Sequence, residues 1–238
     1  MVPLPDPEGI KANVDSERSQ SVWTQLTPTA TVTQSGLKSG ELGPRPTTPG
    51  ADLEEWRLKS AYFHARRFEW PSLAVLVDAA RRQIIDEHPG RIEQLRFLVT
   101  SNPFIATGHE GIFLRGLYAG LVGDWLIAVH LLVPQLEASI RSAFDARGIV
   151  TSTVEAEGIQ KERLLHKLLY HPKMASIFGD KATFNLRGVL VEKFGFNLRN
   201  DMAHGLISEA GFFSPASIVL WLLALHLCSL GSSATDQS

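Results

Sequence analysis

The sequence predicts an all-α protein, a helical bundle that follows a flexible N-terminal tail. Beyond Asp52, apolar residues recur at spacings of three and four, the period of one face of a helix. Turn-forming residues separate these stripes, and no segment shows the strict alternation of a half-buried strand. With 238 residues, of which 44% are hydrophobic, the chain is long enough to form one domain with a substantial core.

Residues 1–50 differ in composition from the rest of the chain. They are rich in Pro, Ser, Thr and Gly, and their scattered apolar residues follow no period. Such a segment buries too little apolar surface to offset the entropy of ordering it. We therefore expect a disordered or irregular tail over 1–50, a helical domain over 51–232 and a flexible C-terminus over 233–238.

Within the domain, the helical stripes follow one another in order. The first begins behind Pro71-Ser72 and ends at Pro89-Gly90, because proline suits a first helical turn and Pro-Gly stops a helix. The second ends before Pro103 for a related reason, since the residue ahead of a proline disfavours helical geometry. The stripes cover residues 73–84, 92–99, 113–121, 125–144, 165–169 and 186–190, and a last apolar segment covers 215–230.

The stripe over 125–144 is the most regular of these predicted helices. Asp124 precedes it as a good N-cap, and Arg147-Gly148 follows it as a typical C-terminal stop. Pro134 lies inside the stripe, where proline removes a backbone donor and clashes with the preceding turn. We expect Pro134 to kink or split this helix.

Several glycines crowd the region around the third stripe. They form neither of the glycine patterns that hold phosphates behind a strand. Gly116 and Gly120 are four residues apart, so they share one face of a helix. We expect close packing of this helix against a neighbour at these two glycines.

The segment 212–230 carries no charged residue, which leaves two interpretations open. It is long enough to suggest a membrane span, and a helix that is apolar all round also belongs at the centre of a bundle. Pro215 and several serines interrupt its start, and no basic cluster flanks it to set an orientation. These features favour the central helix over the membrane span.

Charge and cysteine content narrow the function classes. The formal net charge is -2, so no global basic field exists to hold long nucleic acid non-specifically. Any contact with nucleic acid must therefore depend on a local site. The single cysteine, Cys228, excludes an internal disulfide and a Cys-rich zinc site, and it favours the cytoplasm as the compartment.

The sequence Arg-Asn-Asp-Met-Ala-His-Gly occupies residues 199–205. On a helix, Asn200 and His204 share a face, and the long Arg199 side chain can reach round to join them. This cluster suits a phosphodiester, because arginine can hold two phosphate oxygens and histidine exchanges protons near neutral pH. The same residues can also form an ordinary polar helix end, with Asn197 or Asn200 as a cap and His204 partly buried.

The motif resembles the R-N-x-x-x-H-G signature of the family called domain of unknown function 4209. A second stretch, residues 101–149, is similar to the upstream half of that family, with a G-x-x-G-D step followed by H-L-L-V-P-Q-x-E-x-x-x-R. The family belongs to the HEPN superfamily of all-α nucleotide-binding domains. The resemblance covers about residues 60–230 and leaves residues 1–50 outside it.

The resemblance implies a metal-independent endoribonuclease that acts on RNA as a homodimer. The low net charge fits a short single-stranded substrate better than a long duplex. Arg199 would bind and stabilise the scissile phosphate, His204 would act as general acid or base, and Asn200 would orient the histidine or the phosphate. The RNA 2′-OH would attack in line and leave a 2′,3′-cyclic phosphate and a 5′-OH. The resemblance also suggests a role in toxin–antitoxin systems or phage defence, with an antitoxin as a possible partner.

Three further residues are candidates for a supporting role. Glu137 and Arg141 are four residues apart on the helix over 125–144, where they form either a surface ion pair of little energetic value or part of the site. In the second case Glu137 orients Arg199 across the bundle, and Arg141 lines the path of the phosphate. Asp201, inside the motif, is the third candidate.

The sequence also leads to an expectation about cofactors and leaves one alternative function open. No Asp, Glu or His cluster at metal-ligand spacing accompanies the motif, so we expect neither a metal nor another cofactor. The alternative to the ribonuclease is a non-catalytic helical module that binds nucleotide or RNA, or serves as a scaffold.

Overall fold

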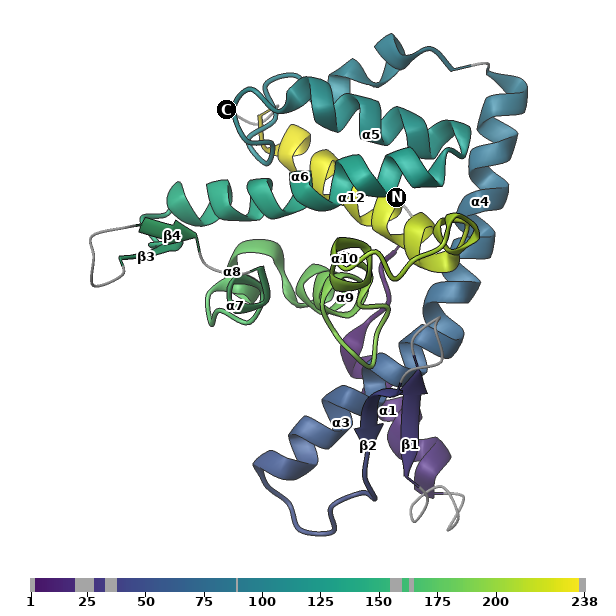
Figure 1. Cartoon of the computed structure of the whole chain (residues 1–238), viewed down its shortest axis with the longest axis vertical. Helices are drawn as coiled ribbons and strands as arrows, with labels where there is room; N and C mark the ends of the chain where they lie inside the picture. Colours follow the sequence, from purple (N-terminus) through teal and green to yellow (C-terminus); the bar gives the residue numbers. More distant parts are fainter. Residues whose placement is uncertain are drawn as a thin grey trace.

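The computed structural model describes residues 3–19, 28–32, 38–88, 90–154, 160–162 and 165–235, and the fold is all-α (Figure 1). The helices are α1 (Pro7–Ser19), α3 (Ala51–His64), α4 (Trp70–Glu87), α5 (Glu110–Val122), α6 (Trp125–Asp145), α7 (Leu165–Leu169), α8 (Met174–Phe178), α9 (Asp180–Leu190), α10 (Leu198–Ala203), α11 (Glu209–Phe212) and α12 (Pro215–Thr235). A π-helix, η1 (Ala65–Glu69), joins α3 to α4, and a 3-10 helix, η2 (Ile92–Leu98), precedes α5.

Two short antiparallel hairpins accompany the helices. The first pairs β1 (Thr29–Val32) with β2 (Lys38–Leu42), and its register shifts between Thr31 and Val32. The second pairs β3 (Ser152–Val154) with β4 (Gln160–Glu162). Neither hairpin shows in the sequence as an alternating pattern, because strands of three to five residues are too short to display a period.

The core lies where α5, α6 and α12 pack together, and α12 also contacts α4 and α9 (Figure 1). The close packing expected at the two glycines of α5 is confirmed. A Cβ at Gly116 would lie 2.8 Å from Leu132, and a Cβ at Gly120 would lie 2.2 Å from Trp221. These contacts bring α5 against α6 and α12 at backbone distance.

The helix α12 occupies the central position that its uniform apolarity favours. Its residues Val219, Leu220, Leu223 and Ala224 are fully buried among the neighbouring helices. Within the described ranges, every helix is too short or too polar to cross a membrane. The helix α12 extends to Thr235, and so includes the first residues of the predicted flexible C-terminus over 233–238, whose remainder lies outside the described residues.

Local signals in the sequence set the bounds of α6. Asp124 is its N-cap, and the Asp124 carboxylate accepts a hydrogen bond of 3.1 Å from the backbone N–H of Ile127. The helix runs from Trp125 to Asp145 without a break, so Pro134 does not split it. Pro134 is exposed, so its ring lies on the solvent side of α6.

The prediction of a disordered or irregular tail over residues 1–50 is wrong for most of the described residues in that range. They form α1 and the β1–β2 hairpin, which gather with α3 at the foot of α4 (Figure 1). Leu4, Ile10 and Val14 are buried, and α1 contacts α3 and α9. The N-terminal segment holds few apolar residues, but they lie on one face. This is sufficient for the segment to pack against the helical domain. Residues 20–27 and 33–37 lie outside the described part.

Polar contacts attach this N-terminal segment to α3. The Asp15 carboxylate forms ion pairs with Arg45 at 3.3 Å and with Arg57 at 3.1 Å. The Trp56 indole N–H donates a 3.0 Å hydrogen bond to the Gly43 carbonyl oxygen. The proposed boundary between a tail and a domain at residue 50 therefore does not separate two structural units in the described residues.

The fold depends on a close approach of α9 to the aromatic side chain of Trp70. A Cβ on Gly188 would lie 2.2 Å from the Trp70 ring and 2.9 Å from the Tyr62 ring. Gly188→Ala should therefore lower the free energy of unfolding by about 1–3 kcal/mol, as overpacking of a core does. Urea denaturation of the purified variant checks this.

The matched control is Gly111→Ala in α5, where an added Cβ would meet nothing within 4 Å. Alanine is the better helix former, so this variant should gain up to about 1 kcal/mol of stability. Equal effects of the two substitutions would contradict the steric role of Gly188.

Candidate functional site

The motif lies on α10, a helix of six residues with unusual backbone at both ends. Asn197, before its first residue, adopts a left-handed conformation with φ of 53°. At the other end Gly205 has φ of 64°, the Gly205 N–H bonds the Met202 carbonyl at 3.0 Å, and the Leu206 N–H bonds the Asp201 carbonyl at 2.8 Å. This pair of bonds is a Schellman cap, which explains the glycine after the histidine by structure alone.

The Arg199 side chain lies between α10 and α6. Its Nε is 3.6 Å from Glu137 Oε2, and its Nη1 donates a 3.4 Å hydrogen bond to Asn200 Oδ1. Glu137 also forms an ion pair with Arg141. The contact that was hypothesised between Glu137 and Arg199 is therefore present, and Glu137 bridges two arginines rather than forming a solvated pair.

Asn200 and Asp201 belong to a network of side-chain amides at the start of α10. Asn200 Nδ2 donates to Asn197 Oδ1 at 2.7 Å, and Asn197 Nδ2 donates to Asp201 Oδ1 at 2.8 Å. Asn197 therefore uses its side chain within this network and does not cap a backbone N–H of the helix. The network fixes the Asn200 amide so that its oxygen faces Arg199.

His204 is exposed at the C-terminal end of α10, in contrast to the partly buried histidine expected of an ordinary helix end. Its backbone N–H bonds the Asn200 carbonyl at 3.0 Å. Among the described residues its imidazole has no hydrogen bond or ion pair, and Asp201 is the acidic group on which its charge acts. The imidazole is thus accessible from solvent.

Burial sets the electrostatics of Asp201 and of a residue that the sequence interpretation missed, Arg66. Burial raises the pKa of the Asp201 carboxyl, and the hydrogen bond from Asn197 and the charges of Arg66 and His204 oppose this rise. Burial lowers the pKa of Arg66, and the Asp201 charge opposes that change. No local pattern in the sequence indicates that Arg66 lies near Asp201, which is 135 positions further along the chain.

A small cavity of about 90 Å³ adjoins the motif and is lined by Leu165, His166, Val191, Arg199 and Asn200. His166, from α7, brings a second imidazole to the same place as Arg199. Its ring stacks on Tyr170 with centroids 4.6 Å apart. No sequence pattern indicates this juxtaposition, because α7 and α10 are separated by more than 25 residues and only the fold brings them together.

Taken together, the described residues form an all-α protein with a surface cluster of guanidinium, amide and imidazole groups. In the described ranges, no group of three or more His, Cys, Asp or Glu side chains is arranged to hold a metal ion. The cluster therefore offers phosphate-binding and proton-transfer groups from its own side chains.

Comparisons with known proteins give one partial likeness. No family model and no solved structure matches the chain. The chain is 33% identical over 89 residues to a protein named "Putative gluconeogenesis factor" from two strains of Mycobacterium tuberculosis, CDC 1551 / Oshkosh and ATCC 25618 / H37Rv. This match covers 35% of the chain and 26% of that protein, so the chain spans about a quarter of the length of these relatives.

The raised pKa of Asp201 predicts a specific pH dependence of stability. The folded protein binds the Asp201 proton more tightly than the unfolded chain does, so this contribution is present at low pH. It is lost as the pH rises from the unfolded value, about 3.9, through the raised folded value. We expect wild type to lose stability relative to Asp201→Asn over that window, measured by urea denaturation at each pH.

The control is Asp86→Asn, at an exposed position of α4. Its difference from wild type should not follow the same pH course. A stability difference between wild type and Asp201→Asn that stays constant with pH would contradict the raised pKa.

Proposed function

We propose that the protein is a metal-independent endoribonuclease of the HEPN type, with Arg199, Asn200 and His204 as its active-site residues. One observation carries the proposal. Arg199 is held by Glu137 on one side and by Asn200 on the other, beside a cavity, while the His204 imidazole on the same short helix is exposed and has no hydrogen bond within the described residues.

In this proposal, each group has one step of the reaction. The Arg199 guanidinium binds the non-bridging oxygens of the scissile phosphate and stabilises the charge that grows on them. The RNA 2′-OH loses its proton and attacks phosphorus, while the 5′-oxygen of the next nucleotide leaves and takes up a proton. His204 moves one of these two protons. The products are a 2′,3′-cyclic phosphate and a 5′-OH.

The charge of the chain supports local reading of a short single-stranded segment. With a net charge of -2, long-range attraction cannot hold a duplex, whereas exposed bases and one phosphate can be contacted at a small site. The proposal includes a homodimer, because one arginine and one histidine are few groups for phosphoryl transfer. A two-fold axis would place a second pair beside the first. It also includes the cytoplasm as the compartment and an antitoxin as a possible partner.

The second candidate function is a non-catalytic helical module for binding RNA or nucleotide, or for scaffolding. Its support is that structure alone explains part of the motif, since Gly205 caps α10 and Asn197 holds Asp201. The name of the partially similar mycobacterial protein describes that protein, and a match over 26% of its length transfers no activity to this chain.

The first test of the proposal is RNA cleavage in the presence of EDTA. Wild type should cleave single-stranded RNA, and His204→Ala should be slower by about 10²–10⁴-fold, the usual contribution of a general acid or base. Fragment end groups should be 2′,3′-cyclic phosphate and 5′-OH, measured by phosphatase sensitivity and mass spectrometry.

The matched control is His88→Ala, which removes an exposed histidine at the end of α4, and it should cleave like wild type. Circular dichroism confirms that each variant is folded. Folded wild type that cleaves no RNA, or His204→Ala that cleaves at the wild-type rate, would sink the ribonuclease and favour the binding module.

A second test concerns Glu137, which contacts Arg199 and not the substrate. Glu137→Gln removes the charge that holds the guanidinium at 3.6 Å while it keeps the shape of the side chain. We expect the cleavage rate to fall by about tenfold, because a less ordered arginine stabilises the transition state less well. Steady-state kinetics should show the loss mainly in kcat.

Glu93→Gln is the control for Glu137→Gln, because Glu93 is exposed on η2. A change in KM alone for Glu137→Gln would assign Glu137 to RNA binding and not to the positioning of Arg199.

A further inference from the structure

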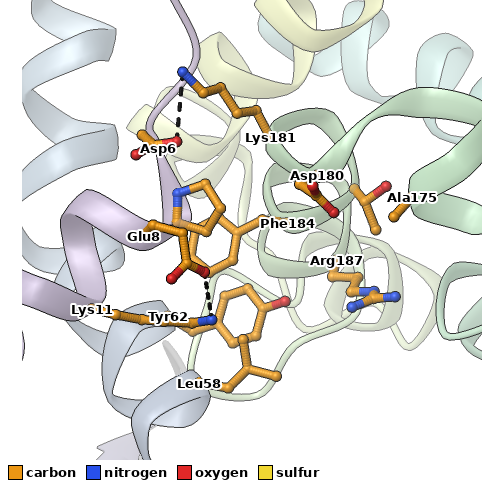
Figure 2. A pocket seen from close by; sticks show the side chains of 12 residues that line it. Asp6, Glu8, Lys11, Leu58, Tyr62, Ala175, Asp180, Lys181, Phe184 and Arg187 are labelled. Atoms are coloured by element: carbon orange, nitrogen blue, oxygen red, sulfur yellow. Dashed lines mark hydrogen bonds and ion pairs between the residues drawn. The ribbon is translucent and has the colours of Figure 1, made fainter.

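A second and larger cavity lies away from the motif, between α1, α3 and α9 (Figure 2). Its volume is about 380 Å³, which is in the range of small-molecule sites. Apolar groups of Leu58, Phe184 and Ala175 form part of its wall, and the rest is polar. The N-terminal segment closes one side of it.

Two of the cations at the rim of this cavity already have partners. Lys11 pairs with Glu8 at 2.8 Å, and Lys181 pairs with Asp6 at 3.5 Å (Figure 2). Both pairs are solvent-exposed, and the positive and negative charges cancel within each pair. They leave Arg187 as the cation in the wall that has no carboxylate within 4.0 Å among the described residues.

Arg187 is held firmly, although it forms no ion pair with a described carboxylate. Its Nε donates a 2.7 Å hydrogen bond to the Leu169 carbonyl, and its guanidinium lies over the Tyr170 ring, 4.5 Å from the centroid. Both contacts restrict the side chain, and neither is an ion pair. The Glu192 carboxylate nearby accepts a hydrogen bond from the Tyr170 hydroxyl instead. A fixed guanidinium in the wall of a cavity is a suitable partner for an anion.

Two buried hydroxyls lie in the same wall without hydrogen-bond partners in the described structure. Tyr62 is 1% exposed and Thr183 is 3% exposed. The Tyr62 hydroxyl lies near Arg187 and the Tyr170 hydroxyl, but neither the Tyr62 nor the Thr183 oxygen forms a hydrogen bond in good geometry with a described residue. Figure 2 shows the Tyr62 hydroxyl pointing toward the Arg187 guanidinium. Thr183 and Arg187 are four residues apart on α9, so they share a face. A buried hydroxyl without a partner costs free energy, which a ligand can recover.

We propose that this cavity binds a small phosphate monoester, with its phosphate at Arg187, Thr183 and Tyr62. Three donors that approach from α9 and α3 suit the three oxygens of a tetrahedral phosphate better than the two oxygens of a planar carboxylate. The cavity exceeds the size of phosphate alone, so the ligand has an organic body. Asp180, which has no ion pair with any described residue and lies two turns before Arg187, accepts hydrogen bonds from amino or hydroxyl groups on that body.

This inference does not depend on the ribonuclease proposal, because its residues and those of the motif are different. Isothermal titration calorimetry of the full chain tests it with inorganic phosphate, ribose 5-phosphate and AMP as probes. Ribose and adenosine are the dephosphorylated controls. We expect at least one monoester to bind about tenfold or more tightly than inorganic phosphate, because the body adds contacts, and we expect no binding of the two controls.

Isosteric variants locate the binding. Thr183→Val and Tyr62→Phe each remove one hydroxyl, and each should weaken binding of the monoester about tenfold, the usual effect of one hydrogen bond to a charged group. Without ligand their thermal stability should equal or exceed that of wild type, because the lost hydroxyl had no partner. Thr100→Val is the matched control, because Thr100 is exposed and does not line the cavity, and it should bind like wild type.

The possible outcomes decide the proposal. Binding that weakens in Thr183→Val and Tyr62→Phe but not in His204→Ala supports this cavity as the site. Binding that weakens only in His204→Ala would place the phosphate at the motif and overturn the inference, as would equal binding of the dephosphorylated controls or no binding of any monoester. None of these results depends on whether the protein cleaves RNA.

Discussion

The contact between Trp70 and α9 is the constraint on which both candidate sites depend. Trp70 is completely buried, and its indole N–H donates a 2.7 Å hydrogen bond to Asn185 Oδ1. Gly188, one turn further along α9, lets the helix lie directly against the ring. Because the bulky Trp70 ring packs against the backbone of a glycine here, α9 can pack against the ring in only one orientation and at one distance. Arg187 and Thr183 then face the cavity beside α1, and the chain leaves α9 in a fixed direction toward α10.

The return of the chain after α9 carries this constraint to the motif. The Phe196 N–H bonds the Gly188 carbonyl at 2.8 Å, and Gly195 lies so close to Gly188 that no side chain would fit. Arg66, from the π-helix, donates a 3.0 Å hydrogen bond to the Gly195 carbonyl. With Asn197 in a left-handed conformation, the chain turns at once into α10. The position of Arg199 relative to Glu137 on α6 is therefore set by contacts of the chain just before the motif.

Local rules predict the helices well and the assembly less well. The cap at Asp124, the glycine pair in α5 and the central place of α12 all follow from spacing and residue type. The structure of the N-terminal segment does not follow from spacing and residue type. Its apolar residues, such as Leu4 and Ile10, are too few to indicate a core, and they are buried only by helices that come later in the sequence. In the candidate site, Arg199 beside Asn200 follows from their adjacency. The approach of Arg66 and His166 arises from long-range packing, which no motif encodes.

The charges around the motif determine what kind of recognition the proposed site can perform. Glu137 pairs with Arg141 and Arg199, and the charge of Arg66 acts on Asp201. These three arginines and two carboxylates together carry one excess positive charge. In a chain of net charge -2, a single excess charge attracts one phosphate at contact and is screened beyond about 8–10 Å at physiological salt. In the proposed ribonuclease, a strand would then be selected by the fit of its nucleotides against α6 and α10, and the weak general attraction would leave unrelated nucleic acid unbound.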